Sequence, residues 1–326
     1  MILVTGATGF VGNHVARALV KKGEAVRILV RKTSNLKWLA DLKLETALGD
    51  LRDRASLDAA VKGCSMLFHV AADYRFDVSD PNDVYQSNVE GTRQLLEAAG
   101  NAGVKRIVYT STVGCIGFIK GGLGNEQTPV ALEMMVGTYK RTKFQAEQVA
   151  LELSRKGLPV VIVNPTAPIG EFDGKPTPTG EMIVRFLRRK MPAVIDTGLN
   201  LIDVRDCAQG HVLAAERGKI GERYILGCKN MTLMEIGQAL GKISGLPAPG
   251  FKLPYAVAYM AGWFDTKFSL MRGKTPSISL EGVKMAKKKM WVECSKAIQE
   301  LSLPQTPPEE ALARAVAWYR ENGYVS

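Results

Sequence analysis

Short, continuously apolar runs alternate with segments of helical periodicity through the first half of the chain. Where apolar residues recur every three or four positions we predict helices, at residues 10–22, 56–62, 82–101 and 138–156. The continuous apolar runs are predicted to be strands, at residues 2–5, 26–30, 44–48, 66–70, 106–111 and 160–164. Such runs are typical of parallel strands buried on both faces, and the alternation supplies the crossover connections that parallel strands need. The pattern therefore predicts an α/β fold with a doubly wound parallel sheet.

The pattern loosens after residue 164. Proline and glycine crowd residues 165–180 (PTAPIGEFDGKPTPTG), which predicts a loop region over a ligand. Residues 203–217 again have helical spacing, and residues 223–226 are predicted to add a strand to the sheet. We therefore expect a larger nucleotide-binding unit and a smaller, mostly helical substrate unit. The expected bounds are residues 1–170 plus about 200–227 for the first unit, and about 171–199 and 228–326 for the second.

The last predicted helix has a clear start signal. Thr306 is expected to be its N-cap, with Pro307 in the first turn, where a missing N–H group costs nothing. Its apolar face includes Leu312, Val316 and Tyr319, which are spaced to pack against the rest of the smaller unit.

The composition is that of a globular protein, since 46% of the 326 residues are hydrophobic and 23% are charged. No basic, apolar leader precedes the first predicted strand, and the longest apolar run, residues 253–264, is shorter than the ~20 residues that a bilayer requires. The five cysteines form no C-x-x-C pair, and the three histidines lack metal-ligand spacing. These features predict a cytoplasmic protein with reduced thiols and no metal site.

The net charge of +11 is unevenly distributed along the sequence. Residues 251–296 contain nine lysines and arginines against three acidic residues, a local charge of +6. The run LPYAVAYMAGWF adds apolar bulk, and AKKKMW places Lys287, Lys288 and Lys289 beside Trp291. The alternatives are a solvated face, an anionic ligand and a peripheral contact with an anionic membrane. We do not expect nucleic acid as a partner.

The first predicted strand runs directly into TGATGFVG, with glycines at positions 6, 9 and 12. Gly6 would allow the tight turn, Gly9 would let the backbone approach a pyrophosphate, and Gly12 would permit close packing of helix on strand. The N-terminus of the next helix offers free N–H groups to the phosphates. Because the motif follows a strand and opens a helix, it predicts dinucleotide binding by a Rossmann unit. The expected cofactor contacts in this loop are Gly6, Thr8, Gly9, Phe10, Val11 and Gly12.

Residues at the ends of the second and third strands would bind the adenosine part of the cofactor. NAD enzymes usually carry Asp or Glu at the end of the second strand, but here Arg31 stands there, followed by Lys32. A cation at this place would pair with a 2′-phosphate, which favours NADP over NAD; a plain surface arginine is the alternative. The third strand ends in GDLRD, where Asp50 would accept from the adenine amino group and Leu51 would pack on the adenine face.

A tyrosine and a lysine lie four residues apart in GTYKRTKFQAE, residues 137–147. On a helix, Tyr139 and Lys143 would share one face, with Cβ atoms roughly 5–6 Å apart. A cation beside a phenol favours phenolate and makes the tyrosine a usable proton donor and acceptor. The alternative is an ordinary solvated pair, and the spacing alone does not decide between the two.

Several short motifs occur together in one order: TGATGFVG, GDLRD, HVAA, NVEGT, YTSTVG and YKRTK. With this set the chain resembles an extended short-chain dehydrogenase/reductase of the NAD-dependent epimerase/dehydratase family over almost its whole length. Within that family it looks like the dihydroflavonol 4-reductase-like branch. The runs HVAADYRF, NVEGTRQLL and GLPVVIVNPTAPIG are similar to bacterial proteins labelled hopanoid-associated sugar epimerases. A family label does not by itself establish epimerisation.

The resemblance implies roles for individual residues. Tyr139 matches the proton donor and acceptor, and Lys143 matches the residue that holds the nicotinamide ribose and lowers the phenol pKa. Thr112 matches the hydroxyl that holds the substrate oxygen, and Ser111 is a weaker candidate. The further cofactor contacts that the resemblance implies are Ala71, Ala72 and Pro165.

Other residues have two interpretations each. Tyr74, after HVAA, and Asn200, in DTGLN, are candidate substrate-binding residues, although packing roles are equally open. Asn88 suits either a catalytic role or a cap, and Asp203 or Asp206 would cap the following helix.

The resemblance implies an NAD(P)-dependent enzyme and leaves its reaction open. Dehydratases of this superfamily usually carry Asp-Glu after the catalytic threonine, whereas Val113 and Gly114 stand here. Epimerases normally hold NAD tightly through an acidic residue, so Arg31 favours an NADP-dependent reductase, with sugar epimerase as the alternative and a non-catalytic member disfavoured. The expected substrate is a small carbonyl, sugar or polyol compound, lipid-linked if the hopanoid label applies, bound by a monomer or homodimer.

Overall fold

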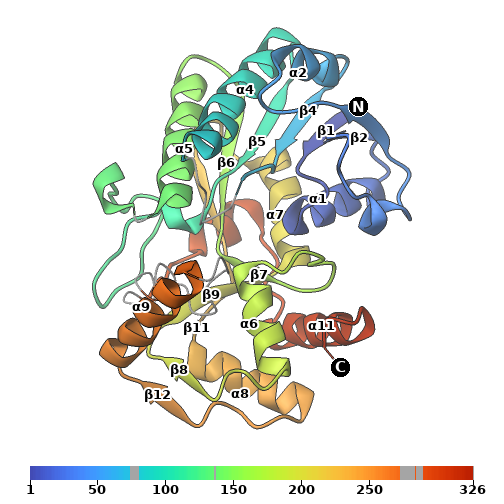
Figure 1. Ribbon diagram of the computed structural model, residues 1–326. Coiled ribbons are helices and arrows are strands. Elements are labelled where there is room, and N and C mark those ends of the chain that lie inside the picture. Colours follow the sequence, from blue (N-terminus) through green and yellow to red (C-terminus); the bar gives the residue numbers. More distant parts are fainter. Residues whose placement is uncertain (74–80, 136, 272–282, 284–288, 326) are drawn as a thin grey trace.

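The computed structural model describes residues 1–73, 81–135, 137–271, 283 and 289–325. Its largest element within those ranges is a sheet of seven parallel strands in the spatial order β10-β6-β5-β4-β1-β2-β3 (Figure 1). The strands are β1 Ile2–Thr5, β2 Val26–Val30, β3 Glu45–Leu48, β4 Met66–His69, β5 Arg106–Thr110, β6 Val160–Pro165 and β10 Arg223–Leu226. The predicted doubly wound α/β fold is confirmed.

Helices cover both faces of this sheet (Figure 1). Helices α1 and α7 pack on one face around an apolar cluster that includes Val15 and Val212. Helices α2, α4 and α5 pack on the other face around Leu57 and Leu95. These helices, with the short turns that precede α4, are α1 Phe10–Lys21, α2 Arg54–Val61, α3 Pro81–Tyr85, the π-helical turn Gln86–Glu90, α4 Gly91–Asn101, α5 Thr138–Arg155 and α7 Val204–Arg217.

Strand β1 lies inside the sheet. Strands β2 and β3 follow on one side of it, and β4, β5, β6 and β10 follow on the other. Thr5, at the end of β1, pairs with Leu29 of β2 and with His69 of β4. The loops that follow these three strands therefore emerge together at the carboxyl ends of the strands. In open parallel sheets such a reversal of strand order leaves a crevice where ligands bind.

A smaller part of the chain lies below the main sheet in Figure 1. It contains a three-stranded sheet in the order β11-β9-β7 and the parallel pair β12-β8. Its elements are β7 Ala167–Ile169, α6 Pro178–Leu187, β8 Ala193–Ile195, β9 Gly198–Asp203, β11 Lys229–Thr232, α8 Leu233–Ser244, β12 Phe251–Leu253, α9 Tyr255–Met271 and α11 Pro308–Glu321. Further single turns are Lys37–Leu39, Val113–Cys115, Leu132–Met134 and Ala297–Leu301. In the described ranges, no helix is long and apolar enough to cross a membrane.

Aromatic side chains join the N-terminal part of the chain to its last helix. Trp38, in the loop after β2, packs against Trp318 of α11 with ring centroids 5.2 Å apart. Phe172 lies 6.3 Å from each of these two rings. Next to Trp318, Tyr319 donates a hydrogen bond to Oδ2 of Asp173 at 2.8 Å. Contacts from residues far apart in the sequence therefore hold α11 in place.

The predicted loop at residues 165–180 is wrong in part, because it contains β7 and the start of α6. The three residues of β7 pair with β9, whose partner residues lie more than thirty positions later in the sequence, so local periodicity carries no sign of them.

The start of the last helix differs by one residue from the prediction. Helix α11 begins at Pro308 with Pro307 as its N-cap, and Thr306 instead gives its N–H to Oδ2 of Asp206 at 2.7 Å. Asp206 is therefore a partner of this turn, and Asp203 alone of the two candidates caps α7, by accepting from the N–H of Arg205 at 2.9 Å. The predicted apolar face of α11 is buried, at Leu312, Val316 and Tyr319.

Candidate active site

The glycine motif that runs from the end of β1 into α1 requires glycine at two of its three glycine positions. Gly6 has a φ of +74°, and a Cβ there would lie 2.6 Å from the backbone N of Ala71. A Cβ on Gly12 would lie 2.1 Å from the carbonyl O of Gly6. Gly9 is exposed, and a Cβ there would meet the same carbonyl O at 3.2 Å. The loop is therefore closely packed at both ends and open to a ligand at its middle.

Helix α1 begins at Phe10, directly behind this opening. Its N-cap, Gly9, has no side chain, and among the described residues no side chain caps the helix and no acidic residue lies in its first turn. The first N–H groups and the positive end of the helix dipole are thus available to an anion. Thr8 is exposed beside the opening, Val11 is half-buried, and Phe10 is buried edge-on against His14. The residues present fit the pyrophosphate of a dinucleotide.

The predicted adenosine-binding residues lie at the same end of the sheet. Arg31 and Lys32 follow β2 and are both exposed. Asp50 follows β3, the next strand, and its Oδ1 accepts from the N–H of Arg52 at 3.0 Å. Leu51 is half-buried beside it. The structure therefore brings all four predicted residues to the carboxyl ends of the strands, with two cations available there.

The predicted contacts near the nicotinamide lie directly after β4 and at the last residue of β6. Ala71 and Ala72 come directly after β4, and the N–H of Ala71 donates to Oγ1 of Thr5 at 3.2 Å, which ties this segment to the glycine loop. Pro165 is buried at the end of β6 and pairs with Leu226 of β10. Both sites therefore lie at the carboxyl ends of their strands.

Thr112 and Tyr139 lie at the starts of two packed turns. Thr112 caps the turn Val113–Cys115, and its Oγ1 accepts from the N–H of Gly114 at 3.1 Å, which leaves the hydroxyl proton to be donated. Tyr139 lies in the first turn of α5, the helix that packs against this turn. A Cβ on Gly114 would lie 3.7 Å from Cε of Lys140, so the two turns approach closely.

Lys143 is buried one turn after Tyr139, with 3% of its surface exposed. Its Nζ donates to the carbonyl O of Thr110 at 2.7 Å and to the hydroxyl of Tyr109 at 3.2 Å. Burial lowers the pKa of Lys143 to about 8, against the opposing effects of the Cys115 thiol and the Glu147 carboxylate. The lysine is therefore a buried cation with one N–H group beyond those two bonds and a pKa close to neutral.

Tyr109 was not predicted as a site residue. Burial raises its pKa well above the usual value, and the phenol of Tyr139 is among the groups that act on it electrostatically. Its hydroxyl accepts from Nζ of Lys143 at 3.2 Å, so Tyr109 is a direct partner of the buried lysine. The signal in the sequence is its place in YTSTVG, one residue before the end of β5, where a side chain reaches the ligand-binding end of the sheet.

Glu147, one further turn along α5, was also missed. It is fully buried, and its carboxylate accepts from Nδ2 of Asn164 at 2.7 Å and from Nη1 of Arg223 at 3.2 Å. The same Asn164 amide donates to the main-chain O of Thr112 at 3.0 Å. These contacts fix the backbone that carries Thr112 relative to the helix that carries Tyr139. The i, i+4 spacing from Lys143 was the only signal for Glu147 in the sequence.

Asn88 bridges two segments of the site. Its Nδ2 donates to the O of Asp73 at 2.9 Å and to Oγ1 of Thr142 at 3.1 Å, and its Oδ1 accepts from the N–H of Asp73 at 2.7 Å. The side chain thus holds the segment after β4 against α5. This geometry favours a positioning role among the alternatives that the sequence left open.

The two remaining predicted substrate-binding residues are Tyr74 and Asn200. Tyr74 lies outside the described residues. Asn200 is buried on β9, where its Nδ2 donates to Oδ1 of Asn230 at 3.0 Å and its Oδ1 accepts from the N–H of Cys228 at 3.0 Å. Its amide therefore joins β9 to the β11 segment, and substrate contact by Asn200 stays a prediction.

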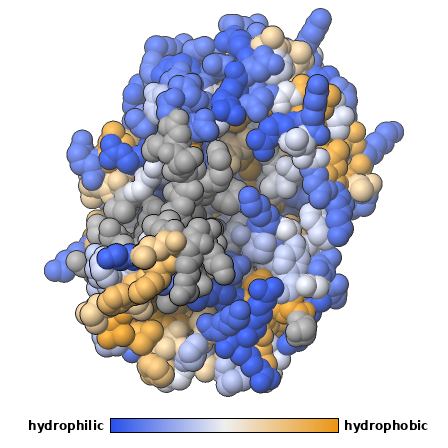
Figure 2. All heavy atoms as spheres, viewed as in Figure 1, coloured by the Kyte–Doolittle hydropathy of each residue, from blue (hydrophilic) through white to orange (hydrophobic). Residues whose placement is uncertain are grey.

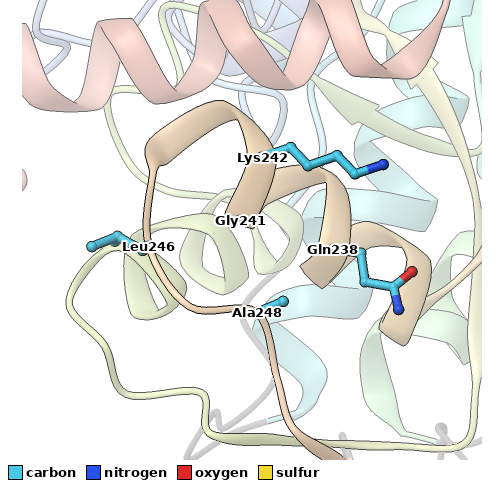
Figure 3. A pocket seen from close by; sticks show the side chains of 5 residues that line it. All are labelled: Gln238, Gly241, Lys242, Leu246 and Ala248. Carbon is cyan, nitrogen blue, oxygen red and sulfur yellow. The ribbon is translucent and has the colours of Figure 1, made fainter.

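A separate, open depression lies on the surface near the end of α8 (Figure 3). Its lining residues are Gln238, Gly241, Lys242, Leu246 and Ala248. Figure 3 shows the side chains of Gln238 and Lys242 on one side of the helix and that of Leu246 on the other. None of these residues lies at the carboxyl ends of the main sheet, so the depression is not the site built above.

Comparisons with known proteins agree with this geometry. A family model described as "NAD dependent epimerase/dehydratase family" matches residues 2–227. A Synechocystis protein named as a dihydroflavonol 4-reductase is 47% identical over 99% of this chain and 95% of its own length. Sterol demethylase protein B of Methylococcus capsulatus is 34% identical over 99% of both chains.

Solved structures agree as well. The crystal structure of gox2253 has a TM-score of 0.89 and 44% identity, covering 100% of this chain and 99% of that one. A nucleoside-diphosphate-sugar epimerase from Pseudomonas aeruginosa has a TM-score of 0.83 and 29% identity over 100% and 99% of the two chains. The chain belongs to the NAD-dependent epimerase/dehydratase family, the extended short-chain dehydrogenases/reductases, and is an NAD(P)-dependent reductase or epimerase.

Proposed function

We propose that the protein is an NADP-dependent reductase that exchanges hydride reversibly with the carbonyl carbon of a small molecule. The observation that carries the choice of NADP is Arg31, exposed after β2 with Lys32 beside it. The chain has no acidic residue from position 31 to position 40, where NAD enzymes place the carboxylate that binds the ribose diol. A guanidinium there pairs with the 2′-phosphate that distinguishes NADP.

The side chains around Tyr139 handle the proton. NADPH, when bound, supplies the hydride to the carbonyl carbon. Thr112 donates its hydroxyl proton in a hydrogen bond to the carbonyl oxygen, and Tyr139 gives its phenolic proton to that oxygen as the carbon is reduced, so that an alcohol forms. Lys143, held by Thr110 and Tyr109, stabilises the resulting phenolate until solvent reprotonates it.

The substrate that we propose is a carbonyl compound with a large apolar part, of sterol or hopanoid type. The support is the name of the Methylococcus relative, sterol demethylase protein B, which matches this chain from end to end. The proposed location of the protein is the cytoplasm. The five free cysteines suit a reducing compartment.

The test is a screen of ketones and aldehydes, including sterol ketones, with NADPH and NADH followed by absorbance. We expect oxidation of NADPH, and the variant Arg31→Asp should lower the NADPH/NADH preference by at least about tenfold, since it removes one charge-assisted pair and installs a diol acceptor. Lys105→Asp makes the same charge change at the amino end of β5 and should leave the preference unchanged. Equal use of both cofactors by the wild type would refute the role of Arg31.

Epimerisation is the second candidate, because the Pseudomonas sugar epimerase matches the whole chain. An epimerase returns its cofactor to the starting state, so it converts one sugar stereoisomer into another without net oxidation of NADPH. NMR of nucleotide sugars incubated with the enzyme and catalytic NAD(P) separates the two candidates.

A further inference from the structure

Helix α9 turns its large apolar side chains outward. Among the α9 positions whose side chains are described, the buried ones are small residues, Ala258 with 5% exposure and Gly262. Five of its exposed large residues are Val257 at 44%, Met260 at 55%, Phe264 at 53%, Phe268 at 53% and Met271 at 75%. Their spacing of three and four positions places all five on one stripe of the helix. We call this stripe the α9 ridge.

The ridge lies within a larger apolar area. Tyr259 and Trp263, exposed by 36% and 41%, flank it on α9, and Phe251 of β12 is exposed by 59%. Figure 2 shows apolar residues gathered at the lower left of the molecule, where Figure 1 draws α9. Scattered apolar residues are normal on a protein surface, but a continuous apolar stripe on one helix marks a contact surface.

Cations accompany the ridge. Lys267 is exposed on α9 with its Nζ 5.1 Å from the ring centroid of Trp263. Lys252 is exposed on β12. Its Nζ lies 3.2 Å from Oδ1 of Asp196, and Nζ of Lys289 lies 3.4 Å from the same atom. One carboxylate thus faces two lysines, which leaves a net charge of +1 in this group. The sequence around them, residues 251–296, carries a net charge of +6.

We propose that the α9 ridge is a docking surface for an anionic lipid bilayer. The ridge enters the boundary between headgroups and acyl chains, and the lysines contact anionic headgroups. Trp263 and Tyr259 suit this depth, because amphipathic rings concentrate at membrane interfaces. The helix lies on the membrane and does not cross it. The proposal depends on α9 and its charges, and not on the reaction proposed above.

The charges favour a bilayer over a second copy of the chain. In a symmetric dimer built on the ridge, each copy would bring the same exposed lysines, Lys252 and Lys267, toward the interface, and like charges would repel. An anionic membrane instead supplies both the apolar phase and the opposite charge. A nucleic acid would supply the negative charge but no apolar phase in which Phe264 and Phe268 could be buried.

The test is co-sedimentation of the full chain with vesicles of phosphatidylcholine alone and of phosphatidylcholine mixed with phosphatidylglycerol. We expect the wild type to bind the mixed vesicles, more weakly as salt is raised. The double variant Phe264→Ser/Phe268→Ser should bind at least about tenfold more weakly, because it removes two aromatic rings from the lipid phase. Lys267→Gln should lower binding to the mixed vesicles by about fivefold.

The matched control is Ile220→Ser/Ile298→Ser, which removes two exposed apolar side chains outside α9 (55% and 39% exposed) and should bind as the wild type does. Absence of wild-type binding, equal binding to both kinds of vesicle, or equal binding by the ridge variant would each overturn the proposal. Sedimentation velocity without lipid covers the remaining alternative: a wild-type dimer that the ridge variant dissociates would assign the ridge to self-association instead.

Discussion

Helices α5 and α9 both depart from the rule that a helix in a globular protein buries apolar side chains and exposes charged ones, and they depart in opposite directions. Helix α5 buries two charged residues, Lys143 and Glu147, with 3% and 0% of their surface exposed. Helix α9 exposes two phenylalanines, Phe264 and Phe268, each by 53%. On α5, charged side chains lie inside the protein, and on α9, aromatic side chains lie on its surface.

The difference lies in how each helix is compensated. Lys143 donates to Thr110 and Tyr109, and Glu147 accepts from Asn164 and Arg223, so hydrogen bonds offset the cost of burying both charges. On α9 the buried positions among those described are alanine and glycine, which bury little apolar area, while the phenyl rings face water. That arrangement does not offset the unfavourable exposure of the rings. The buried charges thus point to chemistry inside the fold, and the exposed rings point to a partner outside it.

The largest effect should come from Tyr139→Phe on α5. Removing the transferable proton should lower kcat about 10²–10⁴-fold on the best substrate found in the screen, while NADPH affinity stays near that of the wild type. Steady-state kinetics and calorimetry measure the two quantities. Arg141→Gln, an exposed change on the same helix, is the control and should leave kcat unchanged. A Tyr139→Phe enzyme with normal kcat would remove the basis for the catalytic assignment.

Glu147→Leu tests whether the buried charge on α5 is held by its partners. The change removes the buried carboxylate that accepts from Arg223 and Asn164 and should lower the free energy of unfolding by about 3–5 kcal/mol. Glu152→Leu removes a carboxylate from the exposed face of the same helix and should change the free energy of unfolding far less, because solvent screens its ion pair with Lys156. Urea denaturation compares the two, and similar losses would mean that the Glu147 network adds nothing special.

The buried lysine should show itself in the pH dependence of stability. The folded pKa of Lys143, about 8, lies below its unfolded value, so between these values the folded state binds fewer protons and stability rises with pH. Relative to Lys143→Met, the wild type without cofactor should therefore gain free energy of unfolding from pH 8 upward, by at most about 3 kcal/mol. Parallel stability curves for the two proteins would show that the lysine has an ordinary pKa in the fold.

The smallest effect should come from α9. Phe264→Ser should change the free energy of unfolding by less than about 0.5 kcal/mol, because the ring is already in water. On α5, Leu153→Ser replaces a side chain with 5% exposure and should cost at least about 2 kcal/mol. If Phe264→Ser were as costly as Leu153→Ser, the ring would be part of the core and the contrast between the helices would disappear.

Local sequence signals were sufficient for the main sheet and for part of the site. Its strands are short apolar runs, and β1, β2 and β10 have the predicted bounds because the change from apolar strand to polar turn is abrupt there. The glycine loop is predicted from its place between a strand and a helix. The Tyr139–Lys143 spacing predicts only a shared helix face, and the catalytic role comes from the family resemblance.

What could not be predicted depends on contacts between distant segments. Tyr109 and Glu147 meet Lys143, Asn164 and Arg223 only after β5, β6, β10 and α5 have assembled. The orientation of α9 could not be predicted either. The run LPYAVAYMAGWF is apolar on nearly every face of the helix, so its periodicity does not indicate which face is buried.

The contact between Trp38 and Trp318 joins a part of the chain that is translated early to the helix that is translated last. During translation the strands of the main sheet leave the ribosome before α11 has been made, and contacts between distant residues close late. Until α11 docks, Trp38 and Phe172 lack their partner and present aromatic surface to chaperones and proteases. In a chain stopped before Pro308, Trp38 and Phe172 would lack their contact with Trp318 permanently.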